Sequence, residues 1–514
     1  MIDRVKRSLA EIAKIWGKSV PVAPAPQSRS MNIRDIIQKE LSRRSDHYAA
    51  GYTNRIRDDW PTTSSIPYTD IKQQLSTIIA RSRREIDNNG IASGIRRTIV
   101  NNVWGEGPIV QAQVKLSNGE IQKGINDELE YAWMRHSEEL DATGQSNFAL
   151  WGKEALETII SSGTVLFNRV PARKGSYLNL AYQMLEPDIL DTSKDDQKIT
   201  QDQNRPEKQV LHGIAIDEYY RPVKYWIKGI NNAISAEYMK HFYQRTRPNQ
   251  VIGVPWLHAS LPDLFDYREI KEDYMTKLRI LADIALWSDP SGDVFFNNVT
   301  KNSDGEALWE PGTWIKSKNE PKVIQADGDL NTALKPLLNR VLLDACCGVG
   351  TSYMAVSRDM DGVNFAASRT NLNEDRAGYK VHRTFMDFQV CQWMWNQFVY
   401  QCVIEGKVTI SPDRFLADPY RYTRVSFQFP AWDWVDPKAD SAAMVNMKGA
   451  GLNSLNDICS KRGIDWRDYI DQVATEIDYI KKAVAGKDVT PEELMAYFKN
   501  SDGVEDAEES KPAE

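Results

Sequence analysis

The sequence contains few of the residue patterns that mark catalytic or metal-binding sites. Its five cysteines are scattered and include no CxxC pair, which excludes a disulfide framework and disfavours a zinc site. The six histidines show no HExxH spacing, and no GxSxG segment is present. The sequence therefore predicts no catalytic residue, no metal site and no cofactor, and its cysteine usage indicates a reducing compartment.

Long apolar runs are also missing. Charge interrupts the longest of them, as Asp344 does between 341 and 349, whereas a membrane-spanning helix needs about 20 apolar residues. The first twenty residues mix both charges through their apolar positions, so they predict an amphipathic docking helix rather than a signal peptide. The Pro- and Ala-rich stretch 21–30 that follows predicts a linker.

The sequence also lacks an excess of basic residues, with 64 Lys and Arg against 71 Asp and Glu. The net charge of −7 argues against a protein that grips nucleic acid over a broad surface, because such binding uses clustered Lys and Arg on phosphates. It does not exclude a protein past which DNA slides. The 514 residues, with 41% hydrophobic side chains and 15 Trp, predict an ordered chain with more than one structural part.

The periodicity predicts an α+β fold. Short β-type runs separated by Gly, Pro, Asn and Asp fill 103–260, with helices near 121–137 and 147–162. Helical spacing then extends over 262–287, breaks into turns and brief strands over 288–330, and resumes over 331–347 with Pro336 placed in the first turn. A turn-rich stretch, a very long helix near 366–405, a β-run before 430 and a helical region over 439–497 follow.

One segment, residues 341–350, resembles a cofactor-binding loop in sequence. VLLDACCGVG (341–350) could be a strand with an acidic residue, Asp344, and a glycine loop, Gly348 and Gly350, that binds S-adenosylmethionine. However, the apolar residues upstream have helical spacing, and the following forty residues contain no clear buried strand. We therefore predict that this segment ends a helix, and keep a methyltransferase as the alternative.

Nine segments in one order resemble the lambda-type portal proteins of tailed bacteriophages. They are RSRREIDNNGIASG (81–94), VWGEG (103–107), LEPDILDT (185–192), GIAIDEYYRPVKYWI (213–227), RPNQVIGVPWLHASL (247–261), EPGTWI (310–315), NFAASRTNLNE (364–374), FPAWDWVDPKADSAA (429–443) and GLNSLNDICSKRGIDWRDYIDQVATE (451–476). Two places depart from the family pattern, Phe365-Ala366-Ala367 and Ala439-Asp440.

The resemblance implies a portal-protein fold with a mixed α/β wing, a long-helix stem, a small β-containing clip and a helical C-terminal crown. The parts expected are an N-terminal helix and linker (1–32), wing (33–261), first stem helix (262–288), clip (289–330), second stem helix (331–355), tunnel loop (356–365), long wing helix and β-run (366–436), crown (437–498) and disordered acidic tail (499–514).

The resemblance also implies a non-enzymatic function. Portal proteins form a ring of twelve subunits at one capsid vertex, through which terminase packages double-stranded DNA and through which the DNA later leaves. The expected partners are other copies of the chain, DNA, terminase, the major capsid protein, a scaffolding protein and adaptor or head-completion proteins, with no membrane. The expected location is the virion, and the host cytoplasm during assembly.

Three groups of site residues are predicted. In the tunnel loop, Arg358 is the candidate DNA contact, flanked by Asp359, Met360 and Asp361, with an ordinary solvated turn as the alternative. In the stem, Lys271, Lys277 and Arg279 could face DNA or pair with a neighbouring subunit's Glu269, Glu272 or Asp273. In the clip, Phe295, Phe296, Trp314 and Ile315 could contact a subunit or an adaptor, or form a buried clip core.

Overall fold

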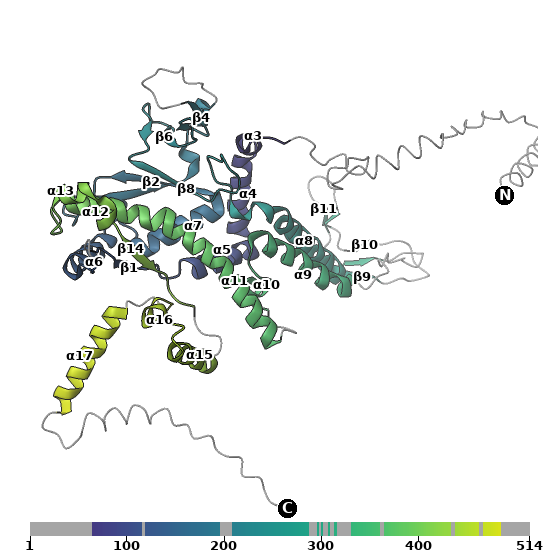
Figure 1. The fold of residues 1–514 in the computed structure, drawn as a ribbon. Helices are drawn as coiled ribbons and strands as arrows, with labels where there is room; N and C mark the ends of the chain where they lie inside the picture. Colours follow the sequence, from purple (N-terminus) through teal and green to yellow (C-terminus); the bar gives the residue numbers. More distant parts are fainter. Residues whose placement is uncertain are drawn as a thin grey trace, which may run out of the picture. The chain divides into compact units, whose positions relative to one another are not determined.

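A computed structural model of the chain describes residues 64–115, 119–195, 208–286, 296–297, 300–301, 307–308, 313–315, 330–359, 364–432, 437–461 and 466–484. The chain divides into two compact units, Met1–Ile66 and Pro67–Glu514, and nearly all described residues belong to the second (Figure 1). The predicted N-terminal helix and linker and the acidic tail lie outside the described residues.

The first part of the second unit combines helices with short strands. Its elements are α3 (Pro67–Lys72), α4 (Leu75–Asn88), α5 (Gly90–Val103), β1 (Ile109–Ala112), α6 (Lys123–Ser137), α7 (Phe148–Ser162), β2 (Thr164–Val170), β3 (Ala181–Leu185), η3 (Pro187–Ile189), η4 (Thr192–Lys194), β4 (Gln209–Leu211), β5 (Ile214–Ile216), β6 (Pro222–Tyr225), β7 (Ile234–Ser235), β8 (Met239–Tyr243) and η5 (Trp256–Ala259). The two helices and the β-type runs predicted between 103 and 260 are confirmed.

These strands form small antiparallel sheets. One has the order β3-β2-β8, and its central strand β2 buries the side chains of its first half. Another is the meander β4-β5-β6-β7. Strand β1 pairs with β14 (Val425–Gln428), which is more than 300 residues later in the chain, with Ile109 opposite Gln428. The sheet pairing therefore ties the chain after α5 to its C-terminal part.

The remaining elements are mainly helices. They are α8 (Leu261–Asp283), β9 (Ile284–Leu286), β10 (Phe296–Asn297), β11 (Thr300–Lys301), β12 (Ala307–Leu308), β13 (Thr313–Ile315), α9 (Leu330–Val349), α10 (Tyr353–Ser357), α11 (Phe365–Met386), a π-helical turn (Asp387–Cys391), α12 (Gln392–Ile404), α13 (Pro412–Ala417), α14 (Pro419–Tyr422), α15 (Pro437–Gly449), α16 (Leu455–Lys461) and α17 (Trp466–Val484). The long helix predicted near 366–405 is confirmed, and α8 packs along α9 (Figure 1).

Aromatic side chains dominate the main hydrophobic core. Trp395 on α12 is fully buried and packs against Trp133 of α6, with ring centroids 5.4 Å apart, and against Phe398, with centroids 5.2 Å apart. Trp104, which follows α5, donates a hydrogen bond from Nε1 to the carbonyl oxygen of Ala149, 2.7 Å away. Trp395 and Trp133 therefore pack α12 against α6, and Trp104 joins the end of α5 to α7.

Several predicted boundaries were wrong. The helix expected to reach 287 ends at Asp283, because Ile284–Leu286 pairs as a parallel strand with Thr313–Ile315, and this pairing overrides helical periodicity. Helix α9 begins at Leu330, so Pro336 lies inside it rather than in its first turn. The second long helix ends at Val349, and a separate short helix, α10, precedes Arg358. The helical region expected over 439–497 divides into three helices as far as it is described.

Candidate functional site

The glycine segment is the end of a helix. Residues 341–349 belong to α9, and Gly350 follows with φ +75, its N–H donating to the carbonyl oxygen of Cys347 at 3.1 Å. A Cβ on Gly348 would lie 2.4 Å from Oγ of Ser260, so α9 and the turn at Ser260 approach each other closely. Asp344 pairs with Arg340 one turn earlier, at 3.1 Å. The segment therefore lacks the strand and open loop that a cofactor site of this type requires.

The residues after α9 are anchored by α11. Asp375 accepts hydrogen bonds from Ser352 N (2.8 Å) and Ser352 Oγ (2.5 Å), while Thr351 Oγ1 lies 2.9 Å from the Tyr379 hydroxyl. Burial raises the pKa of Asp375, and the bonds from Ser352 oppose that rise. The same burial raises the pKa of Tyr379 to about 12. These contacts fix the N-terminus of α10.

Helix α10 also rests on α5. Thr98 Oγ1 donates to the carbonyl oxygen of Ala355 at 3.3 Å, and a Cβ on Gly94 would lie 3.3 Å from a Val356 methyl group. Arg358 closes α10 in the left-handed region, with φ 57, a conformation that costs a non-glycine residue about 1 kcal/mol. Arg358 and Asp359 are exposed, whereas Met360 and Asp361 lie outside the described residues. Helix α10 is therefore held in place by α5 and α11, and the Arg358 side chain at its end is exposed to solvent.

Three of the predicted stem residues meet in one groove. Lys271, Glu272 and Arg279 line a groove of about 430 Å3 together with Asn88, Asn89, Gly90, Tyr267, Arg268, Met275 and Thr276. Arg268 is held in this groove by Glu85 of α4, with Nη1 2.7 Å from Oε1. Lys277 does not line the groove, because it lies two residues before Arg279, about 200° around the helix.

The predicted clip residues lie on two paired strands. Phe296 in β10 is opposite Ile315 in β13, and Asn297 is opposite Trp314. Phe295 and the side chains of the other three predicted clip residues lie outside the described part. Their proposed contacts with subunits or an adaptor stay predictions.

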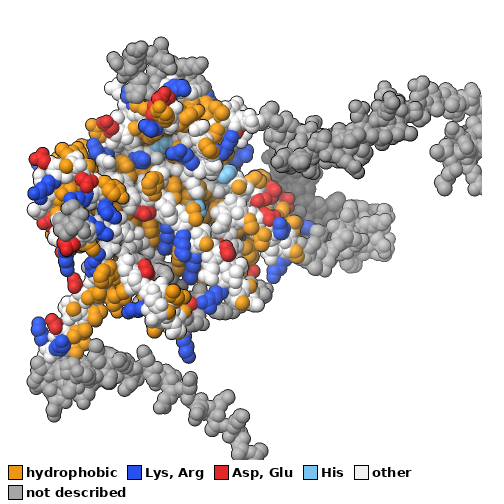
Figure 2. Space-filling view, viewed as in Figure 1, with side chains coloured by type: hydrophobic (Ala, Val, Ile, Leu, Met, Phe, Trp, Pro, Cys, Tyr) orange, Lys and Arg blue, Asp and Glu red, His pale blue; other side chains and the backbone are white. Residues whose placement is uncertain are grey.

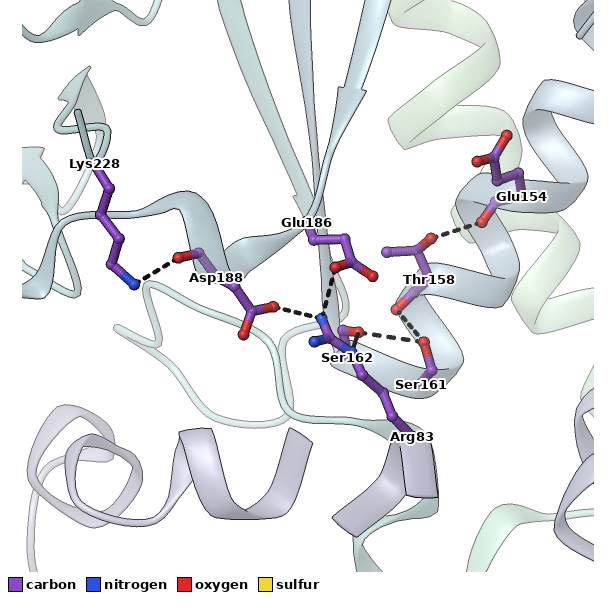
Figure 3. Close-up of polar contacts among 8 residues, drawn as sticks. All are labelled: Arg83, Glu154, Thr158, Ser161, Ser162, Glu186, Asp188 and Lys228. Atoms are coloured by element: carbon purple, nitrogen blue, oxygen red, sulfur yellow. Dashed lines mark hydrogen bonds and ion pairs between the residues drawn. The ribbon is translucent and has the colours of Figure 1, made fainter. Parts of the chain in front are cut away.

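Sequence reasoning missed an ionic junction around Arg83 (Figure 3). Arg83 Nη2 lies 2.5 Å from Asp188 Oδ2 and 3.3 Å from Glu186 Oε2, and Nε donates to Ser162 Oγ at 3.1 Å. Lys228 Nζ reaches the carbonyl oxygen of Asp188 at 2.7 Å. Two of the segments that carry the resemblance, 81–94 and 185–192, therefore meet here, a contact across about a hundred residues that spacing cannot reveal.

A second missed contact involves Arg383 of α11. Its guanidinium lies 3.9 Å from the ring centroid of Trp432 and donates to the carbonyl oxygens of Asn102 and Val103. Burial lowers the pKa of Arg383 to about 10. This contact holds the chain after β14 against the end of α5, so the segment 429–443 has a structural role at Trp432.

Charge on the molecule is mixed. Lys and Arg side chains are interspersed with Asp and Glu on the face drawn in Figure 2. Within the described ranges, no group of three or more His, Cys, Asp or Glu is arranged to hold a metal ion. No helix in those ranges is long and apolar enough to cross a membrane.

Comparisons with known proteins agree on one family. The family model described as phage portal protein, lambda family, matches residues 53–383. A probable portal protein of Halomonas phage phiHAP-1 is 24% identical over 453 residues, covering 83% of this chain and 85% of that protein.

Two solved structures of gene transfer agent particles also match. They are the neck of an empty particle (12% identity, TM-score 0.38) and the virion of the native particle (11% identity, TM-score 0.37), each covering 76% of this chain and 94% of the matched chain. The family match extends from the residues before α3 into α11, so it includes α8, α9 and α10. The chain belongs to the lambda family of phage portal proteins.

Proposed function

We propose that this chain is one subunit of a ring-shaped channel at a capsid vertex, through which double-stranded DNA is packaged, retained and ejected. The observation that carries the proposal is the family match over 53–383. The ring of twelve, the terminase, the major capsid and scaffolding proteins and the head-completion proteins follow from the family. The proposed role is that of a structural conduit in the virion, assembled in the host cytoplasm, rather than of an enzyme.

The elements fit the parts of a portal subunit. We assign α4–α7, α11, α12, strands β1–β8 and β14 to the wing, α8 and α9 to the stem, β9–β13 to the clip, and α15–α17 to the crown. The net charge of −7 supports a channel that lets phosphates pass without strong binding. This assignment makes the loop after Arg358 the tunnel loop.

Electron microscopy of the purified protein, combined with its native mass, tests the ring. We expect rings with a central hole and a mass that is a whole multiple of the chain mass, giving the subunit number directly. A chain that stays monomeric at all concentrations, with and without scaffolding protein, contradicts the proposal.

Arg358 is proposed to contact the passing DNA. Its exposed position at the end of α10, on a base fixed by Asp375, supports this role. We expect Arg358→Glu to lower the amount of DNA packaged in vitro by roughly two- to tenfold, because a carboxylate repels phosphate where the guanidinium attracts it. Arg414→Glu, at an exposed position on α13, is the matched control and should package normally. Equal packaging by both variants would assign 358–363 to an ordinary solvated turn.

A further inference from the structure

Helix α8 carries opposite charges on its two sides. Arg268, Lys271, Met275 and Arg279 recur at three- and four-residue spacing, so they lie along one side, that of the groove. Asp266, Asp273 and Lys277 each lie two residues from one of these positions. Because two residues correspond to about 200° of helix rotation, they occupy the other side.

The groove side has unpaired positive charge. Glu85 already neutralises Arg268, whereas Lys271 and Arg279 are exposed and form no ion pair with any described residue. Glu272 is the acidic residue among the groove's lining. Met275, 43% exposed, adds an apolar surface between the two basic side chains.

The groove has rigid walls. Asn89 caps α5 by accepting from Ile91 N at 3.0 Å, and its Nδ2 lies 3.3 Å from the carbonyl oxygen of Leu264 on α8. The same amide donates to Glu85 at 3.1 Å. The α4–α5 junction is therefore fixed against α8, so the groove exists before any partner arrives.

The other side of α8 is acidic. Asp266 and Asp273 are exposed and form no ion pair with any described residue. Burial raises the pKa of Asp263, and the neighbouring carboxylates of Asp344 and Asp266 raise it further. Lys277 offsets only part of that charge.

We propose that the groove on one copy of the chain receives the acidic side of α8 from the next copy. The inference rests on the proposed ring function and names the contact that builds it. The two surfaces differ and lie on opposite sides of one helix, so the contact is head-to-tail, the kind that closes into a ring when the rotation between copies allows it. Lys271 and Arg279 of one copy then face Asp266 and Asp273 of its neighbour.

A passing DNA duplex is the competing occupant of the groove. A duplex in the groove would meet Lys271 and Arg279 but would leave Asp266 and Asp273 on the other side of α8 without a cation. The acidic side of a second copy meets the two basic side chains and pairs its own carboxylates in the same contact. The charge pattern of α8 therefore favours a second copy.

A charge-swap experiment tests the contact. The groove variant Lys271→Glu plus Arg279→Glu makes both sides of α8 acidic, and the acidic-side variant Asp266→Lys plus Asp273→Lys makes both sides basic. We expect each variant alone to need about tenfold or more higher concentration than the unmodified chain for half-assembly of rings, because like charges then meet at every interface. An equal mixture should restore rings, since each variant's groove then complements the other's α8.

The controls separate this inference from the ring itself. Lys277→Glu leaves the groove intact and should assemble like the unmodified chain. Thermal unfolding of each variant checks its fold, and the neutral set Lys271→Gln, Arg279→Gln, Asp266→Asn, Asp273→Asn should form rings whose assembly no longer depends on salt.

Three results would overturn the inference. The first is normal rings from either charge-reversed variant. The second is a mixture of the two folded variants that fails to assemble. The third is a groove variant that forms normal rings but packages less DNA, which would assign the groove to DNA. If the unmodified chain forms no rings at any concentration, with or without scaffolding protein, the proposed function itself fails.

Discussion

Lowering the pH from about 8 to about 5 is expected to destabilise the folded chain, because His136 and His241 are buried as neutral rings. His136 is 1% exposed and His241 is 7% exposed, and Nε2 of each ring has no hydrogen-bond partner among the described residues. Burial lowers the pKa of His136 to about 4. Burial, with smaller contributions from Lys240 and His212, lowers the pKa of His241 to about 3.

The sign of the effect follows from proton uptake. An unfolded histidine binds a proton below a pKa of about 6.5, whereas the folded rings stay neutral, so acid stabilises the unfolded chain. The contribution of each neutral ring to the free energy of unfolding is fully present above about pH 6.5, the unfolded pKa. It is lost as the pH falls from there towards the pKa of the folded ring. Lowering the pH from about 8 to about 5 should reduce the free energy of unfolding by about 2 kcal/mol for each ring.

Denaturant unfolding of His136→Leu and His241→Leu at both pH values checks this prediction. Each variant should lose part of the pH dependence, and the comparison at pH 8, above the titration window, gives the cost of the substitution itself. A transition midpoint in the unmodified chain that does not change over this range would show that the rings are protonated in the folded state.

Alanine at Gly348 is expected to destabilise the chain by about 1–3 kcal/mol, the usual cost of inserting a methyl group into a packed contact. The new Cβ would lie 2.4 Å from Ser260 Oγ. That hydroxyl is buried and donates to the carbonyl oxygen of Ala345 at 2.6 Å, so it cannot move without losing its hydrogen bond.

A double-mutant cycle measures this contact by thermal unfolding. Ser260→Ala removes the clashing oxygen, so adding Gly348→Ala to it should cost less than about 1 kcal/mol. Gly350→Ala is the matched control: its cost comes from φ +75, with no atom within 4 Å of the new Cβ, and Ser260→Ala should not rescue it. Equal effects of Ser260→Ala on both glycine variants would contradict the packing explanation.

Periodicity predicted the elements well where burial is continuous along one face. The long helix from 365 to 404 has buried positions three and four residues apart, so its sequence carries the signal. Strand β2 is instead a short apolar run whose first four residues are all buried. Periodicity failed where pairing partners lie far apart. Ile284–Leu286 has helical spacing with the residues before it, but the chain near Thr313 offers it a strand partner.

The candidate site shows the same division. The sequence shows Arg358 as a basic residue in a turn-rich stretch. The position of α10, which carries it, depends on Asp375, a carboxylate inside a long helix that no sequence pattern distinguishes. Lys271, Lys277 and Arg279 look equivalent along the sequence, yet only two of them line the groove. Arg83, Glu186 and Asp188 meet only because α4 and the chain after β3 pack together.

The sequence by itself determined the helical and β-type segments, the ending of a helix at the glycine segment and the family resemblance. These depend on spacing and composition within short stretches. Only the tertiary structure decided which side of α8 forms a groove with the α4–α5 junction, which carboxylate anchors the residues before Arg358, and that Gly348 is required beside Ser260. The reason is that these features depend on contacts between residues far apart in the chain, such as Glu85 and Arg268, which are 183 positions apart, and the packing of whole elements sets their geometry.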